Sequence, residues 1–249
     1  MRLFSYISAL AKRFFWPVLL AVFAVSLALI LWSGRTESMG FRDAACFFED
    51  RLPGCLDSVA EWNRGLRYYD SSLASTGDTL RSLKNLLWTH WGLEFAGAEA
   101  SVARNAILPL RVLESGKSGC MGLAWLAMMV AEERGIPLSV ILLPGHVYLR
   151  FGADSASFVN LEPNRRGYSY TDDEYREKYK DGRWTGLEFK PLSASQFVGL
   201  AAFDMGNLYL ESDLRHALTW YRMAEEFFPE YPGIKANQEI AKNRLPDHL

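Results

Sequence analysis

Three residues of the types used in nucleophilic catalysis follow one another along the middle of the chain: Cys120, His146 and Glu162. A thiol attacks a carbonyl group as its thiolate. It gains from a base within hydrogen-bond reach and from a third group that fixes the tautomer of the imidazole. Together the three residues predict a nucleophile, its general base and an orienting acid. The chemistry they predict is acyl transfer at an amide through a thioester.

Each of these residues also has a purely structural explanation. A cysteine at the start of a buried helix is more often packed than reactive, and a histidine at a turn is commonly a polar surface group. Their order on neighbouring predicted elements favours catalysis. Asn160 has the same side-chain parity as Glu162 and is the alternative orienting group, because an amide oxygen can also accept the imidazole proton.

The helix that should carry Cys120 is marked by its composition. Residues 121–134, MGLAWLAMMVAEER, are apolar nearly all round at the start and charged at the end, and Gly135 and Pro137 form a strong stop. This pattern predicts a mostly buried helix with Cys120 at its N-terminus. Unpaired N–H groups and the helix dipole stabilise a thiolate at that position.

Three strands are predicted directly after this helix, at residues 138–143, 146–151 and 157–161. Antiparallel pairing of the second and third strands would bring their outer ends together. His146 begins the second strand and Glu162 follows the third, so we expect their side chains to lie nearly opposite each other.

Helical periodicity recurs on both sides of this core. Before it, residues 56–69 and 79–91 predict two packed helices, and residues 101–113 predict a third whose second half is uncertain because of Pro109. After it, a polar stretch is expected to form a loop with a short helix at residues 172–179. The aromatic-rich part of that stretch, residues 165–179, could rim a substrate groove, although its composition favours a polar loop that covers the sheet.

The C-terminal part of the chain predicts helices at residues 194–209, 214–228 and 233–243. Small and large residues alternate there much as in one tetratricopeptide unit, with the turn one residue short. An ordinary helical hairpin explains the pattern equally well, because such repeats normally stack in several copies. The residues that carry the pattern are Ala202, Gly206, Tyr209, Ala217, Tyr221, Ala224 and Pro229.

The central segment resembles the core of the transglutaminase-like superfamily of papain-like cysteine enzymes. SGCMGLAWLAMMVAEERGIPLSVILLPGHVYLRF followed by VNLEP is similar to a core in which Gly-Cys opens a helix, His begins a strand and Asp-Pro ends the next strand. The likeness is specific over residues 118–163. It extends more loosely to residues 194–243, where members of the bacterial SirB1-type branch carry tetratricopeptide-like helices.

This resemblance implies roles for the three residues. Cys120 would be the nucleophile, His146 the general base, and Glu162 the orienting acid in place of the superfamily's usual aspartate. The backbone N–H of Cys120 would be one oxyanion donor. A second donor is not assigned by the sequence, and the candidates are Trp88, His90 and Trp91.

An uncharged stretch, residues 14–32, is long enough to cross about 30 Å of hydrocarbon as a helix. Basic residues precede it, at Arg2, Lys12 and Arg13, so the positive-inside rule leaves a short N-terminus in the cytoplasm. A cleaved signal peptide is the alternative, but Trp32 stands where small residues are wanted before a cut. We therefore expect an uncleaved anchor in a bacterial inner membrane, with the rest of the chain periplasmic.

The cysteines agree with an oxidising compartment. Cys46 and Cys55 bracket a short turn-prone segment and could close a small loop, which leaves Cys120 as the free thiol. The alternative is that all three are reduced core residues. Net charge is −2 and no dense basic run appears, so nucleic acid is not an expected partner. No metal-ligand pattern appears either, and we expect neither a metal nor another cofactor.

The sequence thus predicts an α+β protein with five parts. These are a cytoplasmic N-terminus (1–13), a transmembrane anchor (14–32), a juxtamembrane linker (33–55), a transglutaminase-like domain (56–193) and a tetratricopeptide-like helical region (194–249). The expected function is a membrane-anchored cysteine enzyme that acts on an envelope protein or peptide. The alternative is a catalytically inactive scaffold that binds a protein partner through its C-terminal helices.

Overall fold

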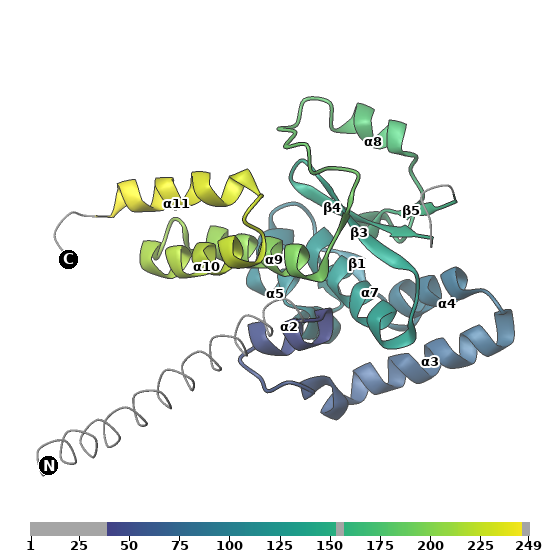
Figure 1. The fold of residues 1–249 in the computed structure, drawn as a ribbon. Coiled ribbons are helices and arrows are strands. Elements are labelled where there is room, and N and C mark those ends of the chain that lie inside the picture. The colour runs from purple at the N-terminus through teal and green to yellow at the C-terminus, as the bar shows by residue number, and fades with distance from the viewer. Residues whose placement is uncertain (1–38, 153–156, 246–249) are drawn as a thin grey trace, which may run out of the picture. The chain divides into compact units, whose positions relative to one another are not determined.

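The computed structural model describes residues 39–152 and 157–245, shown in colour in Figure 1. Residues 40–249 form one compact unit. The predicted cytoplasmic N-terminus, membrane anchor and first part of the linker lie outside the described residues. Within the described ranges, no helix has both the length and the apolar composition needed to cross a bilayer.

Helix α7 (Cys120–Arg134) is the central helix of this unit. Every side chain from Met121 to Ala131 is buried, as the apolar composition predicts, and Gly135 ends the helix with a positive φ of 62°. Gly119 and Gly122 make room at its start, because a Cβ atom there would come within 2.7 Å of Ser101 O and 2.5 Å of Ala106 O. The preceding segment therefore packs tightly around the residue that begins the helix, Cys120.

An antiparallel sheet of four strands, in the order β5-β4-β3-β6, lies beside α7 (Figure 1). One face, with Val147 and Leu149, is buried on the side of α7, which contacts β3 and β4. The other face carries Tyr148, which packs with Tyr175 of helix α8 (Asp172–Lys178). The strands are β3 (Leu138–Leu143), β4 (His146–Phe151), β5 (Val159–Leu161) and β6 (Pro191–Leu192). The first two lie as predicted, β5 begins two residues later than predicted, and β6 was not predicted.

The helices that precede α7 follow the predicted pattern with several breaks, since Val59 and Ala103 also have extended backbones. The expected helix at residues 101–113 is interrupted at Leu108, which has an extended backbone because Pro109 disfavours a helical conformation in the residue before it. A short parallel pair of strands was not predicted. The elements are α3 (Ala60–Thr76), α4 (Thr79–Asn85), η2 (Leu86–His90), β1 (Glu94–Phe95), η3 (Ala100–Val102), α5 (Arg104–Ile107), α6 (Pro109–Ser115) and β2 (Lys117–Ser118).

Part of the segment predicted as a linker, residues 33–55, is instead a packed helix, α2 (Phe41–Phe48). The carboxylate of Glu132 on α7 accepts the backbone N–H groups of Phe41, at 3.2 Å, and Arg42, at 2.9 Å. The indole N–H of Trp125 donates to Phe41 O at 2.9 Å. Helix α2 therefore belongs to the folded unit, because α7 supplies both an apolar surface and a cap for its free N–H groups.

Cys46 of α2 is joined by a disulfide to Cys55, the first residue of η1 (Cys55–Ser58), which decides between the two alternatives that the sequence left open. Cys120 is the remaining free thiol.

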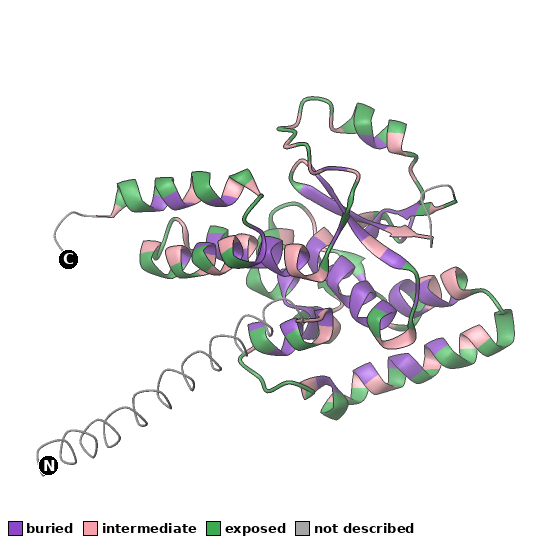
Figure 2. Cartoon of the chain, viewed as in Figure 1, coloured by how far each residue is buried: buried purple, intermediate pink, exposed green. Residues whose placement is uncertain are grey.

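The three C-terminal helices are continuous with the core. Helix α9 packs against α2, α5 and β6, and Figure 2 shows buried and intermediate residues along it. Gly206 lets the ring of Tyr221 on α10 approach closely, since a Cβ atom at residue 206 would lie 2.4 Å from that ring. The helices are α9 (Ala194–Tyr209), α10 (Leu214–Phe227) and α11 (Pro232–Arg244), in agreement with the predicted positions.

We predict that Trp125→Ala destabilises the protein by about 3–5 kcal/mol, because Trp125 is fully buried and joins α2, α7 and α9 through Phe41 O, Phe48 and Phe197. Urea unfolding followed by circular dichroism measures this loss. Trp184→Ala is the control. Its side chain is 39% exposed, and the change should cost less than about 1 kcal/mol. Equal effects of the two substitutions would contradict this account of the core.

Candidate active site

Cys120 and His146 are brought together by the packing of α7 against β4. Cys120 is the first residue of α7 and His146 the first residue of β4, directly after the turn at Pro144 and Gly145. Both side chains line the same two cavities, and the side chain of Cys120 is one of the groups that raise the pKa of His146. The structure thus places the predicted nucleophile beside its predicted base.

His146 and Glu162 form a buried pair on one face of the sheet. The antiparallel pairing of β4 with β5 puts Arg150 opposite Asn160, so the two residues are diagonal neighbours and not directly opposite as expected. Nε2 of His146 lies 2.9 Å from Oε2 of Glu162, and the two side chains are 7% and 2% exposed. An ionised carboxylate only accepts hydrogen bonds, so the imidazole donates from Nε2. Nδ1 is therefore the ring nitrogen left for the thiol of Cys120.

Glu162 is held in place by groups on both sides. Its Oε1 accepts the backbone N–H of Asn164 at 3.1 Å, and its Oε2 also accepts the hydroxyl of Tyr175 at 3.1 Å. Pro163 follows it and begins the short helix η4 (Pro163–Arg165). The carboxylate therefore points at His146 from a fixed backbone, and the extra methylene relative to aspartate is accommodated.

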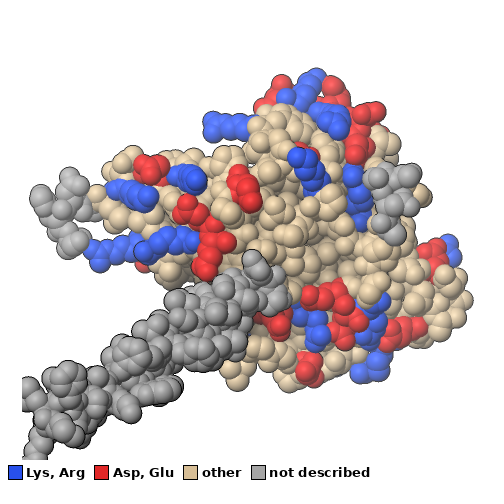
Figure 3. All heavy atoms as spheres, in the orientation of Figure 1, with Lys and Arg blue, Asp and Glu red and all other residues tan. Residues whose placement is uncertain are grey.

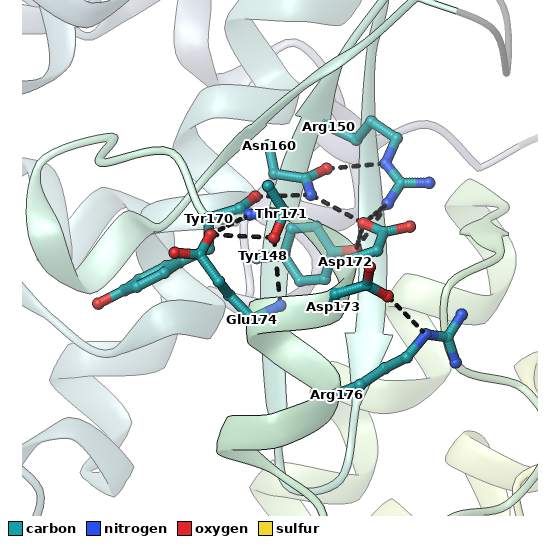
Figure 4. Close-up of polar contacts among 9 residues, drawn as sticks. All are labelled: Tyr148, Arg150, Asn160, Tyr170, Thr171, Asp172, Asp173, Glu174 and Arg176. Carbon is teal, nitrogen blue, oxygen red and sulfur yellow. Dashed lines mark hydrogen bonds and ion pairs between the residues drawn. The ribbon is translucent and has the colours of Figure 1, made fainter.

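Asn160, the alternative orienting group, belongs to a different network, shown in Figure 4. Its Oδ1 accepts from Nε of Arg150 at 2.9 Å, and its Nδ2 donates to Tyr170 O at 2.9 Å and to Oδ1 of Asp172 at 2.8 Å. Arg150 also pairs with Asp172. Asn160 therefore fixes the start of α8 on the sheet, and the side chain that contacts His146 is Glu162.

Two tyrosines were not identified from the sequence as parts of this site. One lies on helix α8 (Asp172–Lys178) and the other directly follows it. Tyr175 is fully buried and donates to Glu162, and Tyr179 stacks on the imidazole of His146, with ring centroids 5.6 Å apart and planes 8° apart. A capping box formed by Thr171 and Glu174 begins the helix. That motif and the four-residue spacing of the two tyrosines were readable in the sequence and indicate one helical face.

Opposing effects set the protonation of the buried pair. Burial disfavours the charged imidazole, but hydrogen bonds to Cys120 and Glu162 and the charges of both outweigh it and raise the pKa of His146 to about 9. Burial also disfavours the carboxylate. His146 and the donors from Asn164 and Tyr175 outweigh this effect and lower the pKa of Glu162. The pair is therefore imidazolium and carboxylate at neutral pH.

Cys120 lies where two cavities meet, of about 190 and 570 Å³. The smaller is walled by β3, β4 and α9, and the larger also reaches residues 95–107. Trp88, His90 and Trp91, the candidates for a second oxyanion donor, line neither cavity. No side chain caps the N-terminus of α7, so the backbone N–H groups of its first turn are available to an oxyanion.

We predict that Glu162→Gln lowers the pKa of His146 by roughly one to three units, because the carboxylate that stabilises the buried imidazolium is lost while burial still opposes it. NMR titration of the imidazole protons measures the change. Glu94→Gln, which neutralises an exposed carboxylate, should leave that pKa unchanged. An unaltered His146 in Glu162→Gln would mean that the glutamate does not hold the imidazolium.

The family of the chain follows from a comparison with known proteins. A family model described as the transglutaminase-like superfamily matches residues 55–199, which is more than half of the chain and includes Cys120, His146 and Glu162. No curated protein matches the chain, and no solved structure does. The geometry and the matched residues agree with the resemblance found in the sequence, and the chain belongs to the transglutaminase-like superfamily.

Proposed function

We propose that this protein is a membrane-anchored cysteine enzyme that cleaves or transfers amide bonds through a thioester. The observation that carries the proposal is the buried His146–Glu162 pair beside Cys120, at an uncapped helix N-terminus that opens into two cavities. The pair supplies a cation to stabilise the thiolate and a proton for a leaving group. The first turn of α7 supplies hydrogen-bond donors for an oxyanion.

In the proposed reaction the thiolate of Cys120 attacks the carbonyl carbon of the amide, and a C–S bond forms. The resulting oxyanion accepts hydrogen bonds from backbone N–H groups at the start of α7. The C–N bond then breaks as His146 gives its Nδ1 proton to the leaving amine. Water or an amine attacks the thioester and returns a proton to His146, and the C–S bond breaks to regenerate the thiolate.

The identity of the second nucleophile separates two activities. Water would make the protein an amidase or peptidase, and an amine would make it a crosslinking acyltransferase. Both use the same first half-reaction, so both need Cys120, His146 and Glu162 in the proposed roles.

The proposed location is the periplasmic side of a bacterial inner membrane, with residues 14–32 as a single span. The uncharged length of that stretch and the basic residues before it support this orientation. The Cys46–Cys55 disulfide supports an oxidising compartment. An envelope protein or cell-wall peptide is the corresponding substrate class. Charges of both signs are interspersed on the face in Figure 3, which supports the expectation that nucleic acid is not a partner.

A catalytically inactive scaffold of the SirB1-type branch, with α9 to α11 acting as a tetratricopeptide-like unit that binds a protein, is the alternative function. The close packing of Gly206 on Tyr221 and of Gly199 on Phe228 favours it, because small residues meet large ones across the α9–α10 hairpin. Glu162 in place of aspartate would also favour lost activity. Its 2.9 Å contact with His146 weakens that argument.

We predict that Cys120 reacts with iodoacetamide at a nearly constant rate from about pH 8 down to about pH 6, although an ordinary thiol, with a pKa near 8.5, slows about tenfold per pH unit in that range. The reason is that His146 remains an imidazolium up to about pH 9 and stabilises the thiolate. His146→Asn should lower the rate at pH 6 by about tenfold or more. Mass spectrometry of the full-length chain measures the modification.

His216→Asn is the matched control, because His216 lies on α10 and lines neither cavity. It should leave the rate unchanged. A slow reaction with an ordinary pH profile in the unmodified protein and in His146→Asn would rule out the enzyme and leave the scaffold.

A further inference from the structure

A second carboxylate, that of Asp204, lines both cavities beside the candidate catalytic residues. It lies on α9, outside the predicted catalytic core, and together with Cys120 and His146 it borders the smaller and the larger cavity. The side of α9 that faces the cavities carries Leu200, Phe203, Asp204, Asn207 and Leu208. Asp204 is thus the acidic side chain of α9 that would face a substrate bound beside Cys120.

The surroundings of Asp204 within the chain do not compensate its charge. Throughout residues 39–152 and 157–245, no lysine, arginine or histidine pairs with its carboxylate and no donor hydrogen-bonds to it. Burial raises the pKa of Asp204 to about 7. Asp204 is half-buried at the cavity wall, so a cation bound there would meet a carboxylate that has no partner among the described residues. A bound cation would neutralise the carboxylate in place of the proton that Asp204 holds at low pH.

Aromatic rings stand around this carboxylate. Phe203 and Tyr231 pack edge to face with centroids 5.3 Å apart, and both line the smaller cavity. Burial first, and then the negative charge of Asp204, raise the pKa of Tyr231, and the charge of Asp204 also contributes at Tyr221. Both phenols therefore lie within the field of the carboxylate. Aromatic faces beside a carboxylate form a favourable environment for an ammonium group.

Asn207, one turn further along α9, adds a polar group to the same wall. Its Oδ1 accepts the hydroxyl of Tyr221 at 2.8 Å and Nδ2 of Asn237 at 2.7 Å. These two bonds fix the orientation of the amide and leave its N–H groups to donate. A peptide carbonyl next to an ammonium group would find both partners on one helix.

We propose that Asp204 is a specificity-determining residue that binds a protonated amino group of the substrate, close to the amide that Cys120 attacks. The inference rests on the proposed function and adds the substrate class to it. The substrate is an amide or peptide with a positive charge near the reacting bond, either a free amino terminus or an amine-bearing side chain. Neutral and anionic amides are disfavoured because they leave the carboxylate unpaired or repel it.

The first test compares two thiol reagents of opposite charge, aminoethyl and sulfonatoethyl methanethiosulfonate, on the full-length protein. The thiolate of Cys120 attacks the sulfenyl sulfur of either reagent, a disulfide forms and a sulfinate leaves. Cys120 is the free thiol of the chain. Both reagents react with the same thiolate, so the ratio of the two rates does not depend on how much of Cys120 is ionised. The ratio therefore reports the charge of the cavity.

We expect the unmodified protein to favour the cationic reagent and Asp204→Asn to reduce the ratio of rates by roughly tenfold. Glu226→Gln is the control. It makes the same change in net charge at an exposed position of α10 that lines neither cavity, and the ratio should stay unchanged. An equal ratio in the unmodified protein and Asp204→Asn overturns the proposal. Rapid alkylation at acidic pH tests the proposed function separately, so the two can fail independently.

The second test identifies the source of the amino group through protection of Cys120 from iodoacetamide. Three peptide amides are compared: trialanine with a free amino terminus, its N-acetyl form, and N-acetyl-Ala-Lys-Ala. Better protection by the free terminus or by the lysine peptide than by neutral acetyl-trialanine supports the proposal and names the source, provided that Asp204→Asn abolishes the difference. Equal protection by all three, or a difference that survives in Asp204→Asn, overturns it.

Discussion

The hydrogen bond between the buried imidazole of His146 and the buried carboxylate of Glu162 is the interaction on which the rest of the site depends. Removing two opposite charges from water costs several kcal/mol for each ion, and only close geometry and further hydrogen bonds offset that cost. The chain supplies both. The sheet register puts the two side chains on the same face as diagonal neighbours, and Asn164 and Tyr175 donate further hydrogen bonds to the carboxylate. The free nitrogen of the ring is thereby directed at Cys120.

Helix α8, which covers this pair, is anchored to the sheet by charged and polar side chains. Arg150, Asn160 and Asp172 connect β4, β5 and the start of α8 through hydrogen bonds, as Figure 4 shows. Because α8 is anchored there, Tyr175 reaches the carboxylate and Tyr179 covers the imidazole. A surface network of polar residues thus excludes water from the ion pair beneath it. The same low-dielectric setting strengthens the attraction between the imidazolium and the carboxylate.

Local pattern was sufficient to predict the central helix, three strands of the sheet and the C-terminal helices, because each is marked by apolar periodicity or by a turn signal. Placing Cys120, His146 and Glu162 at the ends of these elements was enough to predict that they lie close together. The pairing of His146 with Glu162 followed from strand parity alone. The rest depended on contacts between distant segments. Helix α2 is capped by Glu132, far along the chain, and Asp204 enters the site only because α9 folds back beside α7. Such contacts leave no mark on local spacing.

The contact of α2 with α7 also has a mechanical consequence. The compact unit begins at Gly40, so a pull on the chain from its N-terminal side first reaches α2. That helix is joined to α7 through Glu132 and Trp125, and the Cys46–Cys55 disulfide ties its far end to η1. Tension would therefore pass through α2 to α7, the helix that begins with Cys120. A protein built in this way places Cys120 on the element that carries the load.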